Sequence, residues 1–224
     1  MKAKQIVGQA AAKYVKDGMI LGLGTGSTAY YFVAELGRMV KEEGLKVTGV
    51  ATSNRTADQA RELGIPLKSV DEVDRIDLTV DGADEFDPQL NGIKGGGGAL
   101  LIEKIVATYS DQVIWITDDS KKVNQLGAFP LPVEVIKEGS QQLYQLFADR
   151  GYQPSIRLDE AGNKYRTDND NYIIDLALEK IDNPDQLAQE LINLVGVVEH
   201  GLFIDICQRV IYADNGGHIV ELER

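Results

Sequence analysis

The chain has 224 residues, 43% hydrophobic and 26% charged, a composition typical of a globular protein with a hydrophobic core. Its 35 acidic and 23 basic side chains give a net charge of −12, which excludes most nucleic-acid partners and disfavours anionic membrane surfaces. The single cysteine, Cys207, excludes a disulfide within the chain and a cysteine-based zinc site. No segment has the apolar length of a signal peptide or a membrane span, so we expect a cytoplasmic protein.

Apolar spacing predicts alternating helices and strands in the first half of the chain. The predicted helices cover residues 2–17, 29–40, 54–63 and 100–110. The predicted strands cover residues 19–23, 46–52, 65–69, 76–80 and 112–117. Strands that alternate with helices indicate a mostly parallel sheet covered on both faces. The expected fold class is therefore α/β, a Rossmann-like three-layer sandwich.

The pattern changes at Phe129-Pro130-Leu131-Pro132, where two prolines favour a crossing between lobes over the interior of a sheet. Beyond it, strands are predicted at 133–136, 155–158 and 172–178, and helices at 140–149 and 184–194. The order β-α-β-β-α-β is typical of a ferredoxin-like fold, and these five elements follow its first five. We expect a small α+β lobe at 130–200 that contacts another subunit. The main catalytic domain would comprise 1–129 and 201–224, with strands at 201–207 and 209–213 returning to its sheet.

The first candidate motif is Gly22-Leu23-Gly24-Thr25-Gly26-Ser27-Thr28, between a predicted strand and a predicted helix. Glycines let the backbone approach an anion, and the helix that follows offers unpaired N–H groups and its positive dipole end. With the hydroxyls of Ser27 and Thr28 these features predict a phosphate cradle. The spacing matches neither the dinucleotide fingerprint nor the P-loop. The alternative is a tight strand–helix turn with a capping hydroxyl.

The second motif, Asp81-Gly82-Ala83-Asp84-Glu85, directly follows a predicted strand. Ligands of open α/β sheets bind at the carboxyl ends of strands, so these acids could orient sugar hydroxyls or relay protons. The alternative is a solvated acidic turn with a helix cap.

The third motif is Lys94-Gly95-Gly96-Gly97-Gly98, followed by a predicted helix that contains Glu103. Four consecutive glycines are costly to order, and they suit a loop whose backbone N–H groups face a ligand oxygen. Glu103 lies among Leu100, Leu101 and Ile102, and a partly desolvated carboxylate can serve as a general base. The alternative is a surface glutamate that pairs with a lysine.

Two further lysines are candidate phosphate contacts. Lys121, in Asp118-Asp119-Ser120-Lys121-Lys122, follows a predicted strand, and Lys4 lies on the first predicted helix. Either could equally be a solvated surface charge. His200 and His218 have no metal-ligand neighbours, and we interpret both as structural or surface residues.

In their order along the chain these motifs resemble the ribose-5-phosphate isomerases of type A. Within the three motifs the matching residues are Gly24–Thr28, Asp81–Glu85, Lys94–Gly97 and Glu103. The other matching segments are Thr52-Ser53-Asn54, Ser120-Lys121, Gly127, Phe129-Pro130-Leu131-Pro132-Val133-Glu134-Val135, Thr167-Asp168-Asn169 and Gly201-Leu202-Phe203. The resemblance covers essentially the whole chain. Two departures are visible, a fourth glycine at Gly98 and the segment Ile204-Asp205-Ile206-Cys207, and neither touches a proposed catalytic side chain.

The resemblance implies interconversion of ribose 5-phosphate and ribulose 5-phosphate in the non-oxidative pentose phosphate pathway. Asp81 and Asp84 would open the sugar ring and hold its hydroxyls, and Glu103 would move the proton through an enediolate. Lys94 and the N–H groups of the glycines would stabilise the charge on the enediolate. The residues implied to bind the substrate and its phosphate are Lys4, Thr25, Gly26, Ser27, Thr28, Asp81, Gly82, Ala83, Asp84, Lys94, Gly95, Gly96, Gly97 and Lys121. The resemblance implies no metal, no organic cofactor, a sugar phosphate as the only small-molecule partner, and a homodimer or a tetramer.

Three other functions remain open from the residues alone. A sugar-phosphate sensor would need the phosphate cradle but neither Lys94 nor Glu103. An enzyme similar to the coenzyme A transferases would use a glutamate as nucleophile, and it would not account for Asp81 and Asp84. A dinucleotide-dependent oxidoreductase has a different glycine spacing.

Overall fold

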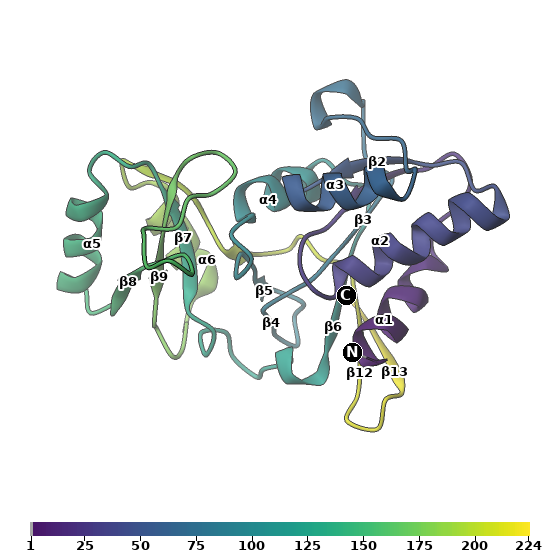
Figure 1. The fold of residues 1–224 in the computed structure, drawn as a ribbon. Helices are drawn as coiled ribbons and strands as arrows, with labels where there is room; N and C mark the ends of the chain where they lie inside the picture. The colour runs from purple at the N-terminus through teal and green to yellow at the C-terminus, as the bar shows by residue number, and fades with distance from the viewer. Residues whose placement is uncertain (1) are drawn as a thin grey trace. The chain divides into compact units, whose positions relative to one another are not determined.

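A computed structural model describes residues 2–224 of the chain, which form two compact units (Figure 1). The first unit contains residues 2–83, 102–122 and 205–224, and the second contains 84–101 and 123–204. All of the lobe expected at 130–200 lies within the second unit, which in addition includes 84–101, 123–129 and 201–204. Within the described residues, no helix has both the length and the apolar character needed to cross a membrane.

The first unit is built from alternating helices and strands. Its α-helices are α1 (Lys2–Ala12), α2 (Ala29–Arg38), α3 (Asn54–Glu62) and α4 (Leu100–Thr108). The first two residues of α4 belong to the second unit's segment 84–101. Shorter helical elements are the π-helical η1 (Met39–Glu43) and the 3₁₀ turns η2 (Val70–Glu72) and η3 (Asp119–Lys121). Its strands are β1 (Ile20–Leu23), β2 (Thr48–Ala51), β3 (Leu78–Asp81), β6 (Val113–Asp118), β12 (Arg209–Ala213) and β13 (Ile219–Glu223). The strands form one sheet in the order β13-β12-β6-β3-β1-β2. All neighbours are parallel except β12 and β13.

Alternating side chains of the sheet face two layers of helix. Leu21 and Leu23 of β1 and Val80 of β3 belong to a core cluster with apolar residues of α1, α2 and α3. On the opposite face, Val50 of β2 packs in a smaller cluster with Val106 of α4. The first unit is therefore a three-layer α/β sandwich with a mostly parallel sheet, which confirms the predicted fold class.

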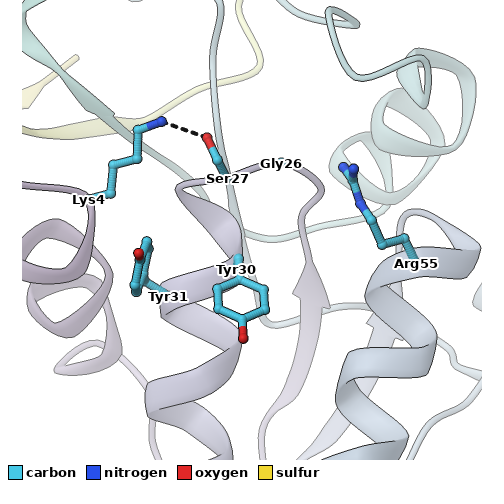
Figure 2. Close-up of a pocket in the computed structure, with 6 residues that line it drawn as sticks. All are labelled: Lys4, Gly26, Ser27, Tyr30, Tyr31 and Arg55. Carbon is cyan, nitrogen blue, oxygen red and sulfur yellow. Dashed lines mark hydrogen bonds between the residues drawn. The ribbon is translucent and has the colours of Figure 1, made fainter. Parts of the chain in front are cut away.

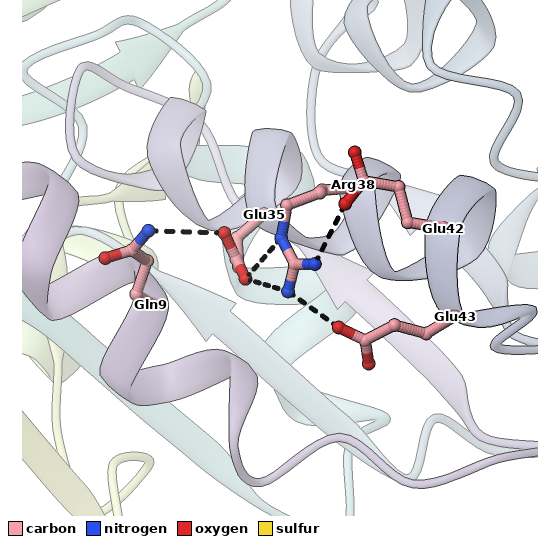
Figure 3. Close-up of polar contacts among 5 residues, drawn as sticks. All are labelled: Gln9, Glu35, Arg38, Glu42 and Glu43. Carbon is pink, nitrogen blue, oxygen red and sulfur yellow. Dashed lines mark hydrogen bonds and ion pairs between the residues drawn. The ribbon is translucent and has the colours of Figure 1, made fainter.

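An ion-pair cluster on the surface of the first unit joins α2 to η1 (Figure 3). The guanidinium of Arg38 lies 2.6 Å from Glu35, 3.2 Å from Glu42 and 2.8 Å from Glu43. Hydrogen bonds from Arg38 and, to a smaller extent, from Gln9 hold the pKa of Glu35 below its usual range. Exposed pairs contribute little to stability individually, so the free energy that this cluster adds to the first unit is small.

The second unit contains an antiparallel sheet with two helices. Its elements are β7 (Leu131–Val135), α5 (Ser140–Asp149), β8 (Pro154–Ile156), β9 (Tyr172–Leu176), α6 (Pro184–Ile192) and β10 (Val197–His200), with the strand order β10-β7-β9-β8. A second, three-stranded sheet has the order β11-β5-β4 and is formed by β4 (Glu85–Phe86), β5 (Gly92–Ile93) and β11 (Leu202–Phe203). The larger sheet has the expected β-α-β-β-α-β order, completed by β10, and its antiparallel pairing is that of a ferredoxin-like fold.

Several predicted elements differ from the structure. The strand predicted at 65–69 is reduced to one bridge between Gly49 and Leu67. The strand predicted at 201–207 does not join the main sheet, because Leu202 and Phe203 pair with β5 of the second unit. Pro132 lies within β7, opposite Asp175 of β9. The proline is accommodated there because the pairing of β7 with β10 begins only at the next residue.

Candidate active site

The turn between β1 and α2 is attached to the carboxylate of Asp81, the last residue of β3. The N–H of Gly24 donates to the carbonyl of Val80 (3.0 Å), and the N–H of Thr25 donates to Oδ1 of Asp81 (2.9 Å). The same oxygen accepts from the N–H of Gly82 (2.7 Å). Because β1 and β3 are parallel neighbours, their carboxyl ends lie at the same edge of the sheet. The first motif therefore meets Asp81 and Gly82, the start of the second motif, within the first unit.

Gly24 has to be a glycine for reasons of space. A Cβ atom at this position would overlap both the carboxylate and the Cα of Asp81. Gly24→Ala should therefore push the turn away from β3 and cost roughly 1–3 kcal/mol of stability, the usual range for overpacking. Thermal unfolding of the variant checks this. Gly18→Ala is the control, because a Cβ at Gly18 has open space and adds only backbone strain. An unchanged melting temperature for Gly24→Ala would contradict the proposed overlap.

The hydroxyl of Thr25 is bound within the first unit. Thr25 is buried, and its Oγ1 lies 2.7 Å from Oγ1 of Thr52 and 2.8 Å from Oγ of Ser53. Ser53 is also the N-cap of α3, where its side chain accepts from the N–H of Thr56. This cluster links the turn to α3. Thr52 and Ser53, directly after β2, therefore have a structural role in holding the turn.

A pocket of about 380 Å³ lies beside the turn (Figure 2). Its lining consists of Lys4, Gly26, Ser27, Tyr30, Tyr31 and Arg55. The ammonium of Lys4 donates to Oγ of Ser27 (2.7 Å), so the structure brings this distant lysine to the predicted cradle. Gly26 has φ +116°, a conformation that favours glycine. Thr28 caps α2 without a side-chain hydrogen bond, and the positive end of the helix dipole adds to the field of the cations.

The sequence reasoning missed three residues of the pocket lining, Tyr30, Tyr31 and the cation Arg55. Arg55 is an exposed residue in the first turn of α3, directly after Thr52-Ser53-Asn54, and Figure 2 shows it on the other side of the turn from Lys4. The sequence signal that could have found Arg55 is a basic residue directly after a segment that resembles the family. Lys121, by contrast, is absent from the described lining of the pocket; it ends η3, at the carboxyl end of β6.

Asp81 and Glu103 are the two buried predicted acids of the first unit. Asp81 is 1% exposed and Glu103 is 4% exposed. Glu103 lies in the first turn of α4, where a carboxylate interacts favourably with the helix dipole. Its neighbour Ile102 and Val106, one turn further on, belong to the apolar cluster beneath the sheet. Gly82 and Ala83 follow Asp81 and are partly exposed.

The second unit brings the other predicted residues together. The N–H of Gly96 donates to Oδ2 of Asp84 (2.7 Å). Lys94 is 3% exposed, its backbone N–H donates to the carbonyl of Gly201, and its ammonium lies 5.5 Å from the centre of the Phe203 ring. A lysine this buried in a small unit is uncommon and costs free energy to desolvate, which is typical of a functional site.

Two further buried acids of the second unit support loops. The carboxylate of Glu85 accepts from the N–H groups of Gly127 (2.8 Å) and Phe129 (2.5 Å). Oε1 of Glu134 accepts from Thr167 (2.8 Å) and Asn171 (3.0 Å), and burial raises the pKa of this carboxyl. Glu85, the last acid of the predicted motif Asp81–Glu85, is thus a structural residue that holds the segment around Gly127 and Phe129.

The remaining predicted residues are spread over both units. The ring of His200 accepts from the N–H of Leu202, and His218 pairs with Asp214 at the surface. Throughout the described part of the chain, no three His, Cys, Asp or Glu side chains are grouped as metal ligands.

A sequence model of the family described as ribose 5-phosphate isomerase A (phosphoriboisomerase A) matches residues 48–217. The chain belongs to this family. It is 63% identical over 214 residues to ribose-5-phosphate isomerase A of Streptococcus agalactiae (serotype III), with 96% of each chain covered. The corresponding protein of Streptococcus thermophilus is 60% identical over 221 residues, with 98% of each chain covered.

Solved structures of ribose-5-phosphate isomerases have the same fold. The enzyme of Methanocaldococcus jannaschii is 40% identical with a TM-score of 0.93, over 99% of this chain and 98% of that chain. A D-ribose-5-phosphate isomerase in complex with phospho-erythronic acid is 39% identical with a TM-score of 0.95, over 99% and 97%. The chain is therefore an isomerase of the ribose-5-phosphate isomerase A family.

Proposed function

We propose that the chain interconverts D-ribose 5-phosphate and D-ribulose 5-phosphate, with Glu103 carrying the proton through an enediolate. The observation that carries this proposal is the buried carboxylate of Glu103 at the start of α4, in a chain of this family. A general base works best when it is held in place and shielded from water. Glu103 takes the proton from C2 of the open-chain aldose and returns it to C1, while the proton of the C2 hydroxyl passes to the oxygen at C1, so no electron acceptor is required.

Negative charge develops on the oxygens at C1 and C2 as the proton leaves. The proposal assigns the stabilisation of this charge to Lys94 and to the backbone N–H groups of the glycine run, Gly97 foremost, since the N–H of Gly96 already donates to Asp84. The burial of Lys94 supports this role, because a desolvated cation interacts more strongly with a developing anion. Asp81 and Asp84, with the Gly82-Ala83 segment between them, hold the sugar hydroxyls and assist ring opening.

The phosphate is assigned to the turn between β1 and α2. Gly26, Ser27 and Thr28 offer backbone and hydroxyl donors, and Thr25 keeps the turn in shape from below. Lys4 already donates to Ser27. We add Arg55 of the same pocket to Lys4 and Lys121 as a cation for the phosphate. These cations overcome, locally, the repulsion from the net charge of −12.

Arg55→Gln should raise the KM for ribose 5-phosphate about 10-fold and leave kcat nearly unchanged. The reason is that a charge-assisted hydrogen bond to a phosphate is made equally in the ground state and in the transition state. Steady-state kinetics checks this, with Arg61→Gln as the control. Arg61 is an exposed arginine on the same helix that pairs with Asp58. An unchanged KM for Arg55→Gln would remove this residue from the phosphate site.

The test of the proposed function is the conversion of ribose 5-phosphate to ribulose 5-phosphate by the unmodified protein. The assay contains a chelator and no added cofactor. Robust turnover is expected, with solvent deuterium incorporated into the product because the proton passes through a side chain. Binding of ribose 5-phosphate without turnover would instead favour a sugar-phosphate sensor.

The cellular setting is part of the same proposal. An isomerase acting on these two pentose phosphates serves the non-oxidative branch of the pentose phosphate pathway, in the cytoplasm. We propose a homodimer as its working form.

A further inference from the structure

The glycine run Gly95–Gly98 is held by an arginine 61 or 62 residues further along the chain. Nη1 of Arg157 donates to the carbonyl oxygen of Gly95 (2.8 Å) and to that of Gly96 (3.2 Å). Arg157 directly follows β8 and begins the hairpin that leads to β9. These contacts lie entirely within the second unit.

Arg157 is itself held in one orientation by Asp175 of β9. Nε of Arg157 donates to Oδ2 of Asp175 (2.9 Å), and Nη2 donates to Oδ1 (2.5 Å). The two side chains are only 15% and 17% exposed. A bidentate pair between a planar guanidinium and a carboxylate determines both position and direction. The remaining nitrogen of Arg157 is therefore aimed at the two glycine carbonyls.

The geometry of the peptide bond transmits this orientation to the N–H groups. In a planar trans peptide the C=O and N–H bonds point in opposite directions. The carbonyl of Gly95 shares a peptide plane with the N–H of Gly96, and the carbonyl of Gly96 shares one with the N–H of Gly97. By binding both carbonyls on one side, Arg157 directs both N–H groups toward the other side.

One of these N–H groups already has a known target. The N–H of Gly96 donates to Oδ2 of Asp84, at 2.7 Å. Gly97 is exposed, so its N–H is accessible to a ligand. The positive charge of Arg157 on the carbonyl oxygens also polarises both peptides, which makes their N–H groups stronger donors.

We propose that Arg157 is a positioning residue for the isomerisation, aiming the N–H of Gly97 at an oxygen of the enediolate and the N–H of Gly96 at Asp84. This inference rests on the proposed function, since it needs an enediolate to stabilise. Arg157 does not touch the substrate and acts through the two peptides. It explains why a run of four flexible glycines can offer a donor in a fixed direction.

The test compares Arg157→Lys with the unmodified protein. Lysine keeps the positive charge, but its single nitrogen cannot form the bidentate pair with Asp175 while a separate nitrogen reaches the carbonyls. We expect kcat to fall about 10–100-fold, at or below the loss seen when one oxyanion donor is removed. KM should change less than about 3-fold, because the phosphate contacts are made by other residues. Phospho-erythronic acid carries an anionic carboxylate that can stand in for the oxygens of the enediolate, so its inhibition constant should rise with the fall in kcat. The inhibition constant of inorganic phosphate, which has no such group, should stay constant.

Two matched variants accompany this test. Asp175→Asn leaves Arg157 in place but weakens its anchor, and it should lower kcat in the same direction. Arg166→Lys changes an exposed arginine of the same hairpin that pairs with Asp170, and it should have no effect. Asp175→Asn also keeps the inference testable if Arg157→Lys fails to fold.

The outcomes separate this inference from the proposed function. An unmodified protein without isomerase activity would overturn the proposed function. An active protein in which Arg157→Lys or Asp175→Asn keeps its kcat would overturn only the role of Arg157. A variant whose KM rises at constant kcat, or whose affinity for inorganic phosphate falls, would also overturn it, because the effect would then be one of binding or of general distortion.

Discussion

Glu103→Gln is expected to lower kcat for ribose 5-phosphate by about 10²–10⁴-fold, the range that a general base contributes. The amide has the shape of the carboxylate but cannot accept and return the C2 proton. KM should stay within a few-fold of its original value, because the phosphate contacts are unchanged. Steady-state kinetics measures the fall. The rate at which the product takes up deuterium from solvent shows whether proton transfer is the step that is lost.

The control for this variant is Glu138→Gln, which changes an exposed glutamate outside the proposed site and should be fully active. Circular dichroism and thermal unfolding establish that both variants are folded. If Glu103→Gln and the unmodified protein have equal activity, the isomerase assignment stands and the base is Asp81 or Asp84 instead.

Lys94→Met is expected to lower kcat by about 10²–10³-fold, as for the loss of a preorganised group that stabilises the transition state. Methionine retains the apolar stem against Phe203 and removes only the ammonium group. Steady-state kinetics measures the fall in kcat, and thermal unfolding establishes that the variant is folded.

Lys164→Met is the matched control for Lys94. The ammonium of Lys164 lies 5.0 Å from the centre of the Tyr172 ring, a similar contact in the same unit, but Lys164 is exposed. Its replacement should change neither kcat nor the melting temperature. A loss of stability in Lys94→Met without a fall in kcat would show that Lys94 is structural.

Local patterns predicted many of the elements. The predicted strand at 209–213 coincides with β12, and the helices predicted at 54–63 and 100–110 begin where α3 and α4 begin. These segments combine apolar periodicity with clear start signals, such as Ser53 before α3. β13 was not predicted. It is an edge strand, and its alternation of half-exposed and exposed residues resembles a solvated tail.

The contacts within each candidate site could not be predicted in the same way. Nothing near Lys4 in the sequence indicates that its ammonium meets Ser27, and nothing near Arg157 indicates the carbonyls of Gly95 and Gly96. Thr25 was expected to face the phosphate, yet its hydroxyl joins the cluster at Thr52 and Ser53. In each case the two partners are more than 20 residues apart in the sequence. The register of paired strands and the packing of helices determine how close their atoms come in space.

By itself, the sequence determined the fold class, the family and the order of the chemistry-bearing motifs, because each depends on residue types and on short-range spacing. The tertiary structure alone decided which donor meets which acceptor. It placed Arg55 in the pocket with Lys4, attached the turn after β1 to Asp81, and gave the glycine run a fixed direction through Arg157. The physical reason is that a hydrogen bond requires its two atoms within about 3 Å, and for residues far apart in the chain only the packed fold determines that separation.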